Sequence, residues 1–163
     1  MKNITATLAL LFTLYCCTAQ KSTTVKMGKA TLKIEGQEIN KYQTRDVRTN
    51  EVFTITNYFN ITDKWIFFYE VVMDGKTAFQ VYETKISGTT KLTATMEEEQ
   101  NERYMQATMY KVIIKCPQTT ECATQTVTTK GEVLKQKTKE TEIILLFENK
   151  AYAESFTKAF KAP

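Results

Sequence analysis

Hydrophobic residues are most concentrated at residues 64–73 (KWIFFYEVVM), a segment that contains the only tryptophan of the chain. Alternate positions place Trp65, Phe67 and Tyr69 on one face, and the intervening positions are also apolar except for Glu70. A strand that is apolar on both faces is normally covered on both sides. The pattern therefore predicts a central strand of a β-sheet, around which the rest of the chain packs.

The segments on either side of this strand continue the β pattern. Residues 52–61 alternate hydrophobic and polar side chains with a period of two, which is typical of a half-buried strand. The Asp-Gly pair at 74–75 predicts a two-residue hairpin turn into a strand at 77–86. With a further strand at 90–96, residues 52–96 are expected to form a four-stranded antiparallel meander.

The other internal segments are shorter or more polar. Three further strands are predicted from alternating or β-branched residues, namely 29–34, 104–115 and the short exposed segment 124–129. Three polar segments without periodicity are predicted to connect strands, namely a loop at 41–51, a solvated turn or first helical turn at 97–103 and a mobile connection at 130–140.

The C-terminal segment predicts a last buried strand followed by a helix. Residues 142–147 (EIILLF) are almost continuously apolar, and Asn149 is a favourable N-cap for a helix at 150–161. Phe156 and Phe160 lie on one stripe of that helix. A helix of about twelve residues is marginally stable alone, so its apolar stripe is expected to dock on the sheet.

The whole pattern predicts a mainly β protein, α+β at most. About seven or eight antiparallel strands are expected to close into a barrel or stack as a sandwich, with one C-terminal amphipathic helix. Residues 142–161 resemble the ending of pleckstrin-homology-like barrels, whose helix plugs one open end, and are similar to lipocalin-like barrels, which carry a late helix outside. The early Gly-x-Trp of lipocalins is absent, since Trp65 follows Lys64 in mid-chain. The resemblance implies a fold and no functional residues.

The N-terminus has the pattern of a secretory signal peptide. A short positive start precedes an apolar run at 6–15, and small residues precede Gln20. The run is shorter than the roughly 20 residues that span a bilayer. Cleavage after Ala19 is expected to remove residues 1–19 and leave 20–163 as a single β-rich domain, secreted or periplasmic, without a transmembrane segment.

Two alternatives remain open for this N-terminus. The apolar run is also compatible with a buried N-terminal helix. Cys17 follows Leu14 by three positions, which is a poor match to the bacterial lipoprotein pattern because Tyr15 and Cys16 fill the places of small residues. Attachment of a lipid at Cys17 would hold the protein on a membrane.

Two cysteines remain after the signal peptide, Cys116 and Cys122. An even pair in an exported protein predicts a disulfide. Five residues separate the pair, so it lacks the C-x-x-C spacing of redox motifs, and a metal site would need further ligands. The tripeptide at 60–62 fits the N-glycosylation pattern in a eukaryote, with Asn60 in a predicted turn.

Composition excludes several kinds of chemistry. The chain contains no histidine, which excludes histidine acid–base catalysis, Ser-His and Cys-His nucleophile pairs and histidine-ligated metals. No cofactor or metal site is expected. A net charge of +4 is mild, and 19 lysines stand against 3 arginines. Because arginine dominates bidentate recognition of phosphates and bases, a nucleic-acid partner is not expected.

Three functions are compatible with these observations. The first is a non-enzymatic interaction or structural module of the cell envelope or extracellular space. The second is a lipocalin-like binder of a small apolar ligand, with Trp65, Phe67, Tyr69 and Glu70 as candidate ligand-binding residues. Aromatic residues on a central strand more often belong to the core. The third is an enzyme.

The enzyme hypothesis depends on Glu70, the one charged residue inside the apolar strand. Burial is expected to raise its pKa. A glycosidase-like pair needs a second carboxylate about 5–10 Å away. Counting back from the predicted turn places Glu70 opposite Phe79, with Glu83 four residues farther along, roughly 13 Å away. The sequence therefore predicts that the two do not act together and that the protein is not an enzyme.

Overall fold

The computed structural model describes residues 22–105, 107–117, 121–129 and 136–160. The predicted signal peptide, the alternative lipid site at Cys17 and the first part of the predicted connection, residues 130–135, lie outside these ranges. The described residues form eleven strands, a short 3-10 helix and an α-helix. Their bounds are β1 Ser22–Met27, β2 Ala30–Glu35, β3 Gln37–Arg45, β4 Val52–Ile61, β5 Trp65–Asp74, β6 Thr77–Ser87, β7 Thr93–Gln100, η1 Glu102–Tyr104, β8 Thr108–Lys115, β9 Ala123–Thr129, β10 Gln136–Glu140, β11 Glu142–Phe147 and α2 Lys150–Ala159.

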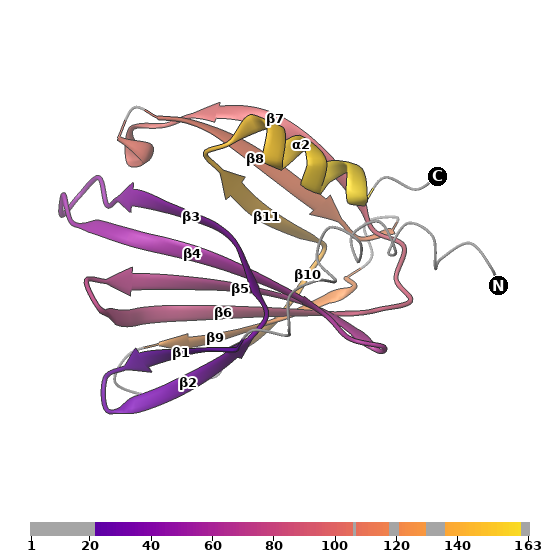
Figure 1. The fold of residues 1–163 in the computed structure, drawn as a ribbon, viewed down its shortest axis with the longest axis horizontal. Coiled ribbons are helices and arrows are strands. Elements are labelled where there is room, and N and C mark those ends of the chain that lie inside the picture. Colours follow the sequence, from indigo (N-terminus) through magenta and orange to yellow (C-terminus); the bar gives the residue numbers. More distant parts are fainter. Residues whose placement is uncertain (1–21, 106, 118–120, 130–135, 161–163) are drawn as a thin grey trace.

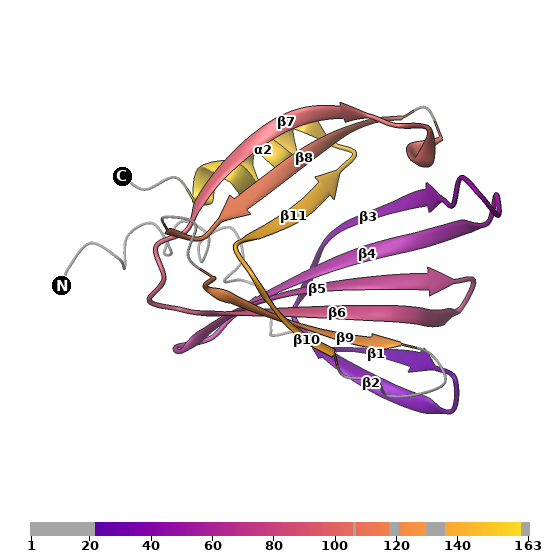
Figure 2. The same ribbon diagram turned by 180° about the vertical axis from the view of Figure 1, so that it is seen from behind.

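The strands form three antiparallel sheets in a sandwich-like arrangement. A six-stranded sheet has the order β10-β9-β6-β5-β4-β3, a three-stranded sheet the order β11-β8-β7, and β1 pairs with β2. Figures 1 and 2 show the three-stranded sheet and α2 above the six-stranded sheet, with the β1–β2 hairpin below it. The mainly β fold with one C-terminal helix is thus confirmed, as a sandwich rather than a closed barrel.

At one corner of the sandwich the chain passes three times between the large sheet and the small one. The strands β10, β9 and β6 lie side by side, and their chain neighbours β11, β8 and β7 keep that order in the small sheet. The backbone N–H of Cys116 donates to the carbonyl of Thr141 (2.9 Å) at this corner. The small sheet is therefore a folded-over continuation of half of the large one.

The predicted disulfide is present at this corner. The Cα atoms of Cys116 and Cys122 are 5.7 Å apart, and the bond joins the end of β8 to the start of β9. The next paired residues are Lys115 with Glu142 and Ala123 with Glu140, so the loop between the cysteines is an insertion in one otherwise continuous strand ladder. The disulfide closes that insertion.

β5 is an interior strand whose two faces are both covered, as the sequence predicts. Ile66 and Phe68 belong to the core between the two large layers. Tyr69 and Val71 face the other way and pack against the β1–β2 hairpin, whose Ile34 is fully buried. The hairpin explains why this strand carries apolar residues on both faces.

The helix closes the core at one end, and its predicted cap is confirmed. The Asn149 side chain accepts a hydrogen bond from the backbone N–H of Tyr152 (2.9 Å), which satisfies one free donor of the first turn. The Phe156 ring lies 5.8 Å from Phe59 of the large sheet and 5.4 Å from Phe147 of the small sheet. The stripe therefore docks between both sheets, as expected for a helix too short to be stable alone.

The predicted loop at 41–51 is wrong over its first half. β3 runs to Arg45, and only the following residues form a turn. The pairing of β3 with β4 shifts register between Glu38 and Asn40. Because of this irregularity Ile39 and Tyr42 are both buried at a spacing of three, which hides the period of two that would identify a strand.

The predicted four-stranded meander is correct for β4, β5 and β6 and wrong for the fourth strand. β7 leaves the large sheet and pairs with β8, while β9 takes the place beside β6. β7 also extends through the acidic run to Gln100, where a turn was predicted. The Lys111 ammonium on β8 lies 2.9 Å from Glu97 and 3.7 Å from Glu99, which favours the extended conformation there.

Two other predictions about polar segments change. β9 is an interior strand of the large sheet rather than an exposed one, and residues 136–140 of the predicted connection form the edge strand β10. Asn60 lies within β4 rather than in a turn and is only 9% exposed. A Cβ atom at Gly36 would lie 3.4 Å from that of Asn60, so the backbone of the preceding hairpin covers the glycosylation tripeptide's asparagine.

Candidate functional site

The structure places three of the predicted ligand-binding residues on the outer face of the six-stranded sheet. Trp65 is 38% exposed, and the Lys85 ammonium lies 3.8 Å from its ring centroid and 5.7 Å from that of Phe67. Phe67 and Tyr69 stack at 6.1 Å. Burial under the hairpin, together with Glu83, raises the pKa of Tyr69 to about 12. These aromatics mainly form a packed wall with one exposed end at Trp65.

The fourth predicted residue, Glu70, lies on the opposite face, toward the interior of the sandwich. It is partly buried, and burial raises its pKa to about 6, as the sequence predicts. The structure therefore does not bring Glu70 together with Trp65 and Phe67. Strand alternation, which separates neighbouring residues onto two faces, is the reason.

The hairpin between β5 and β6 differs in detail from the prediction. Asp74 pairs with Thr77, so the two central turn residues are Gly75 (φ +56°) and Lys76 rather than the Asp-Gly pair. A register shift after Val72 then places Glu70 opposite Tyr82, not opposite Phe79. Glu83 comes to lie opposite Tyr69.

Glu70 and Glu83 lie on opposite faces of the sheet rather than at a distance along one face. Glu83 is directed to the outer face, with Tyr69, whereas Glu70 is directed inward, with Tyr82. The sheet itself separates the two carboxyl groups, so they do not form an acid–base pair across a common cleft.

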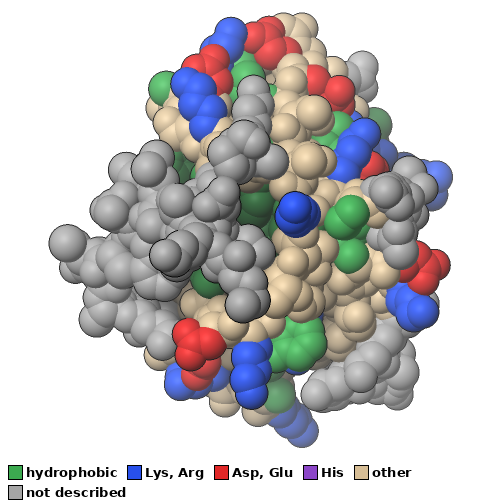
Figure 3. All heavy atoms as spheres, turned by 90° about the vertical axis from the view of Figure 1, so that its right-hand side faces the viewer, with side chains coloured by type: hydrophobic (Ala, Val, Ile, Leu, Met, Phe, Trp, Pro, Cys, Tyr) green, Lys and Arg blue, Asp and Glu red, His purple; other side chains and the backbone are tan. Residues whose placement is uncertain are grey.

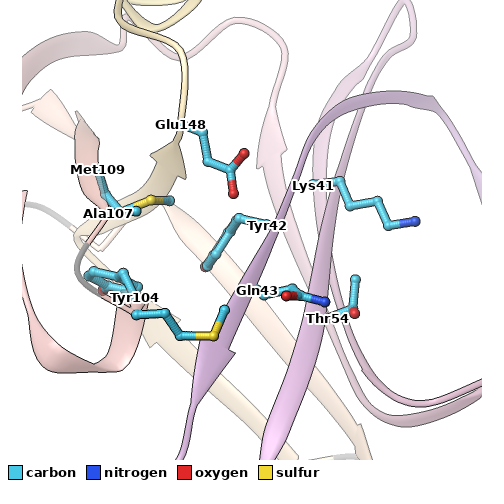
Figure 4. A pocket seen from close by; sticks show the side chains of 9 residues that line it. Lys41, Tyr42, Gln43, Thr54, Tyr104, Ala107, Met109 and Glu148 are labelled. Carbon is cyan, nitrogen blue, oxygen red and sulfur yellow. The ribbon is translucent and has the colours of Figure 1, made fainter.

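A pocket that the sequence did not predict lies beside the edge strand β3. We call it the lateral pocket. Its volume is about 480 Å³. It is lined by Lys41, Tyr42, Gln43, Thr54, Tyr104, Met105, Ala107, Met109 and Glu148 (Figure 4).

The segment between β7 and β8 folds back to form one wall of this pocket. The backbone N–H of Arg103 donates to the Asn101 side chain (3.1 Å), and the N–H of Ala107 donates to the carbonyl of Tyr104 (3.0 Å). Met105 has a positive φ of 51°, which reverses the chain. This compact turn brings the Tyr104 ring edge-on to Tyr42, with centroids 6.3 Å apart.

The lateral pocket has an apolar floor and a polar rim. Tyr42 is 5% and Met109 1% exposed, whereas Met105 is 38% exposed at the mouth. Figure 4 shows Tyr42 and Tyr104 directed toward one another across the pocket, with the Glu148 carboxylate above Tyr42 and the Lys41 ammonium pointing away. Such a lining suits an apolar group with one or two hydrogen-bonding atoms.

Tyr42 is the most strongly perturbed group of the lateral pocket. Burial raises its pKa above the ordinary range of a phenol, and the negative charge of Glu70 and the neighbouring Tyr104 and Glu99 act in the same direction. The hydroxyl therefore stays neutral and can donate or accept a hydrogen bond. It does not serve as a general base near neutral pH.

The sequence signals for this site were weak because its residues come from separate segments. Tyr42 lies in the stretch whose periodicity is hidden by the register shift, and Met109 follows the acidic run by several residues. The only usable signal is the tyrosine and the two methionines at 104–109, which a buried strand end explains equally well.

Other kinds of site are not evident in the described part of the chain. Within those ranges, no three His, Cys, Asp or Glu side chains gather in a way that would hold a metal ion. None of the described helices combines the length and hydrophobicity that a membrane crossing requires. On the face shown in Figure 3, hydrophobic side chains form small separate patches between charged and polar ones.

Comparison of the chain with protein-family models, with curated proteins and with solved structures finds no match. The residues of this chain are therefore the basis for its proposed function.

Proposed function

We propose that the protein is an exported, non-enzymatic interaction module that binds an extended segment of a partner protein along β3. An apolar side chain of that segment enters the lateral pocket. The observation that carries this proposal is the position of the pocket, directly beside the outer edge strand of the six-stranded sheet.

The edge of β3 offers backbone groups for such a partner. Among the described strands β3 pairs only with β4, so alternate N–H and C=O groups of β3 are directed away from the sheet. At Asn40 the side chain already holds β11 through the carbonyl of Leu146. Beyond Asn40, Lys41, Tyr42 and Gln43 border the pocket. Strand addition with side-chain pockets is a common mode of peptide recognition.

Export of the protein is supported by two features. The N-terminal sequence has the pattern of a signal peptide, and the Cys116–Cys122 disulfide is typical of an oxidising compartment. Both features support a secreted or periplasmic location. A lipid at Cys17 would keep the same module at a membrane surface without changing the lateral pocket.

The alternative is a small apolar ligand, and the packed interior disfavours a lipocalin-like site for it. The part of the core next to α2 is filled by Phe59, Phe68, Phe156 and Phe160, all less than 9% exposed. The predicted residues Phe67 and Tyr69 pack in the second cluster, under the hairpin. A small apolar ligand of the lipocalin type would therefore have to use the lateral pocket, in place of a partner's side chain.

The proposal is tested with a pocket-filling variant. Ala107 is exposed and lines the lateral pocket, so Ala107→Trp should occupy it without disturbing the core. Ala151→Trp, on the exposed side of α2, is the matched control. A displayed library of random peptides is selected on the exported protein. We expect enriched peptides to bind wild type and Ala151→Trp equally and to lose at least tenfold in affinity for Ala107→Trp.

Two results would contradict this function. The first is a library that yields no peptide above background. The second is a set of peptides that bind Ala107→Trp as well as wild type. A native mass spectrum of the exported protein decides between the alternatives, since extra mass that is present in wild type and absent from Ala107→Trp would identify a small ligand in the lateral pocket instead of a peptide partner.

A further inference from the structure

A second pocket lies on the inner face of the six-stranded sheet, between that face and β11. We call it the Glu70 pocket. Its volume is about 330 Å³. Its polar lining consists of Glu70, Tyr82, Thr84, Gln125, Glu140 and Glu142. It is separate from the lateral pocket, since the two share no lining residue.

The charge of this lining is of one sign. Three glutamates contribute to it, and no lysine or arginine is among its described lining residues. The Thr138 hydroxyl donates to the Glu140 carboxylate (2.7 Å). Glu142 lies opposite Lys115 in the β11–β8 pair, but Lys115 does not line the pocket. Glu70 is therefore the carboxylate on the large sheet that has no cationic side chain beside it in this pocket.

Glu70 has neither an ion pair nor a hydrogen-bond partner among the described residues, and burial is the only cause of its raised pKa. Its neighbour on β6, Tyr82, donates its hydroxyl hydrogen bond to Gln80 instead (2.7 Å). The Gln125 amide is directed to the Thr84 hydroxyl (3.4 Å). The polar groups around Glu70 thus form hydrogen bonds with other residues and none with Glu70.

The neighbour of Glu70 on β4 is also unsatisfied. Asn57 lies directly opposite Glu70 in the β4–β5 pair, on the same inner face, and is 1% exposed. Neither its Oδ1 nor its Nδ2 atom has a hydrogen-bond partner among the described residues. Buried polar groups are nearly always paired in native proteins. The inner face of the sheet thus carries two adjacent polar side chains that the described residues leave without hydrogen-bond partners.

From this combination we infer that the Glu70 pocket binds a small organic cation, a primary ammonium or guanidinium group on a short apolar body. The cation would pair with Glu70, and Asn57, with its unpaired amide, lies beside that carboxylate. The walls formed by Phe68 and Leu145, 2% and 3% exposed, would contact the apolar body. A metal ion is a poorer match, because the carboxylates are not grouped closely enough to ligate one together.

The protonation of Glu70 sets the pH range of this binding. Only the ionised carboxylate pairs with a cation, so a proton and the ligand compete for the same group. Glu140 and Glu142 line the same pocket from the β10–β11 side. Burial raises the pKa of Tyr82 and of Tyr42, and the negative charge of Glu70 adds to both shifts. Affinity should therefore rise between pH 5 and pH 7.

The test uses three probes of similar size, n-butylammonium, n-butylguanidinium and the neutral n-butanol. Binding is followed by two-dimensional amide NMR of the exported protein at pH 7 and at pH 5. We expect both cations to shift amides near Glu70 and Asn57 and butanol to shift them far less. Glu70→Gln should weaken cation binding at least tenfold and remove its pH dependence.

The matched control is Glu83→Gln, which removes a carboxylate from the same region of the sheet but on the opposite face. It should leave cation binding unchanged. The inference is overturned if neither cation binds, if butanol binds as well as the cations, or if Glu83→Gln weakens binding as much as Glu70→Gln does. Thermal melting of both variants confirms that each is folded. Peptide binding at the lateral pocket should persist in Glu70→Gln, so the two proposals fail independently.

Discussion

The side-chain amide of Asn40 donates a hydrogen bond to the backbone carbonyl of Leu146. Asn40 lies on β3, at one edge of the six-stranded sheet, and Leu146 lies on β11, at one edge of the three-stranded sheet. Elsewhere the two sheets are joined at the corner where β6, β9 and β10 connect to β7, β8 and β11. The hydrogen bond therefore fastens the side of the sandwich from which the lateral pocket opens.

Replacing Asn40 with alanine should weaken this fastening. Loss of the donor removes one partly buried hydrogen bond and leaves the Leu146 carbonyl without it, which predicts a loss of about 1–2 kcal/mol in the free energy of unfolding. Urea unfolding measures the change. Gln43→Ala, at an exposed position of the same strand, is the control and should shift stability by less than about 0.5 kcal/mol. Equal stability of the two variants would show that the bond contributes nothing.

Phe156 should be among the most sensitive positions of the helix. It is 3% exposed and contacts aromatic rings of both sheets. Phe156→Ala is therefore expected to lower the free energy of unfolding by about 3–5 kcal/mol. Phe79→Ala is a matched control, because that ring is 41% exposed and should cost less than about 1 kcal/mol. Thermal and urea unfolding give both values. A small effect at Phe156 would mean that α2 does not close the core.

The parts of this fold that could be predicted from sequence are those whose signal is local. β5 and α2 were identified because the apolar run around Phe68 and the stripe of Phe156 and Phe160 are complete within about ten residues. β3 was missed because the register shift before Asn40 interrupts its alternation. One displaced residue is enough to cancel a period of two.

The remaining errors concern contacts between distant segments. Nothing within residues 90–96 indicates that β7 pairs with β8 rather than β6, since the choice depends on β9 reaching β6. The turn at Gly75–Lys76 and the register shift after Val72 together change the partner of Glu70 from Phe79 to Tyr82. Tyr42, Tyr104 and Glu148 come together in the lateral pocket only after these strands have paired, so no local sequence pattern predicts the pocket.

Removing the disulfide should destabilise the corner where strands change sheets. In the chain-entropy model a loop as short as that between Cys116 and Cys122 contributes roughly 2–3 kcal/mol. The double variant Cys116→Ala and Cys122→Ala should therefore unfold at lower urea concentration than wild type. A reducing agent should lower the urea midpoint of wild type to that of the variant and leave the midpoint of the variant unchanged. If reduction leaves the wild-type midpoint in place, the bond does not stabilise the corner.

Stability should also depend on pH through Glu70. Its pKa is raised from 4.5 to about 6 by burial, so the folded state holds this proton more tightly than the unfolded state. The resulting stabilisation is fully present below about pH 4.5 and is lost as pH rises through about 6, up to roughly 2 kcal/mol. Urea unfolding of wild type and Glu70→Gln between pH 4 and pH 7.5 isolates this contribution, because other carboxyl groups titrate in both proteins. The difference in unfolding free energy between them should move in favour of Glu70→Gln as pH rises. A difference that stays constant across that range would mean that Glu70 is solvated and has an ordinary pKa.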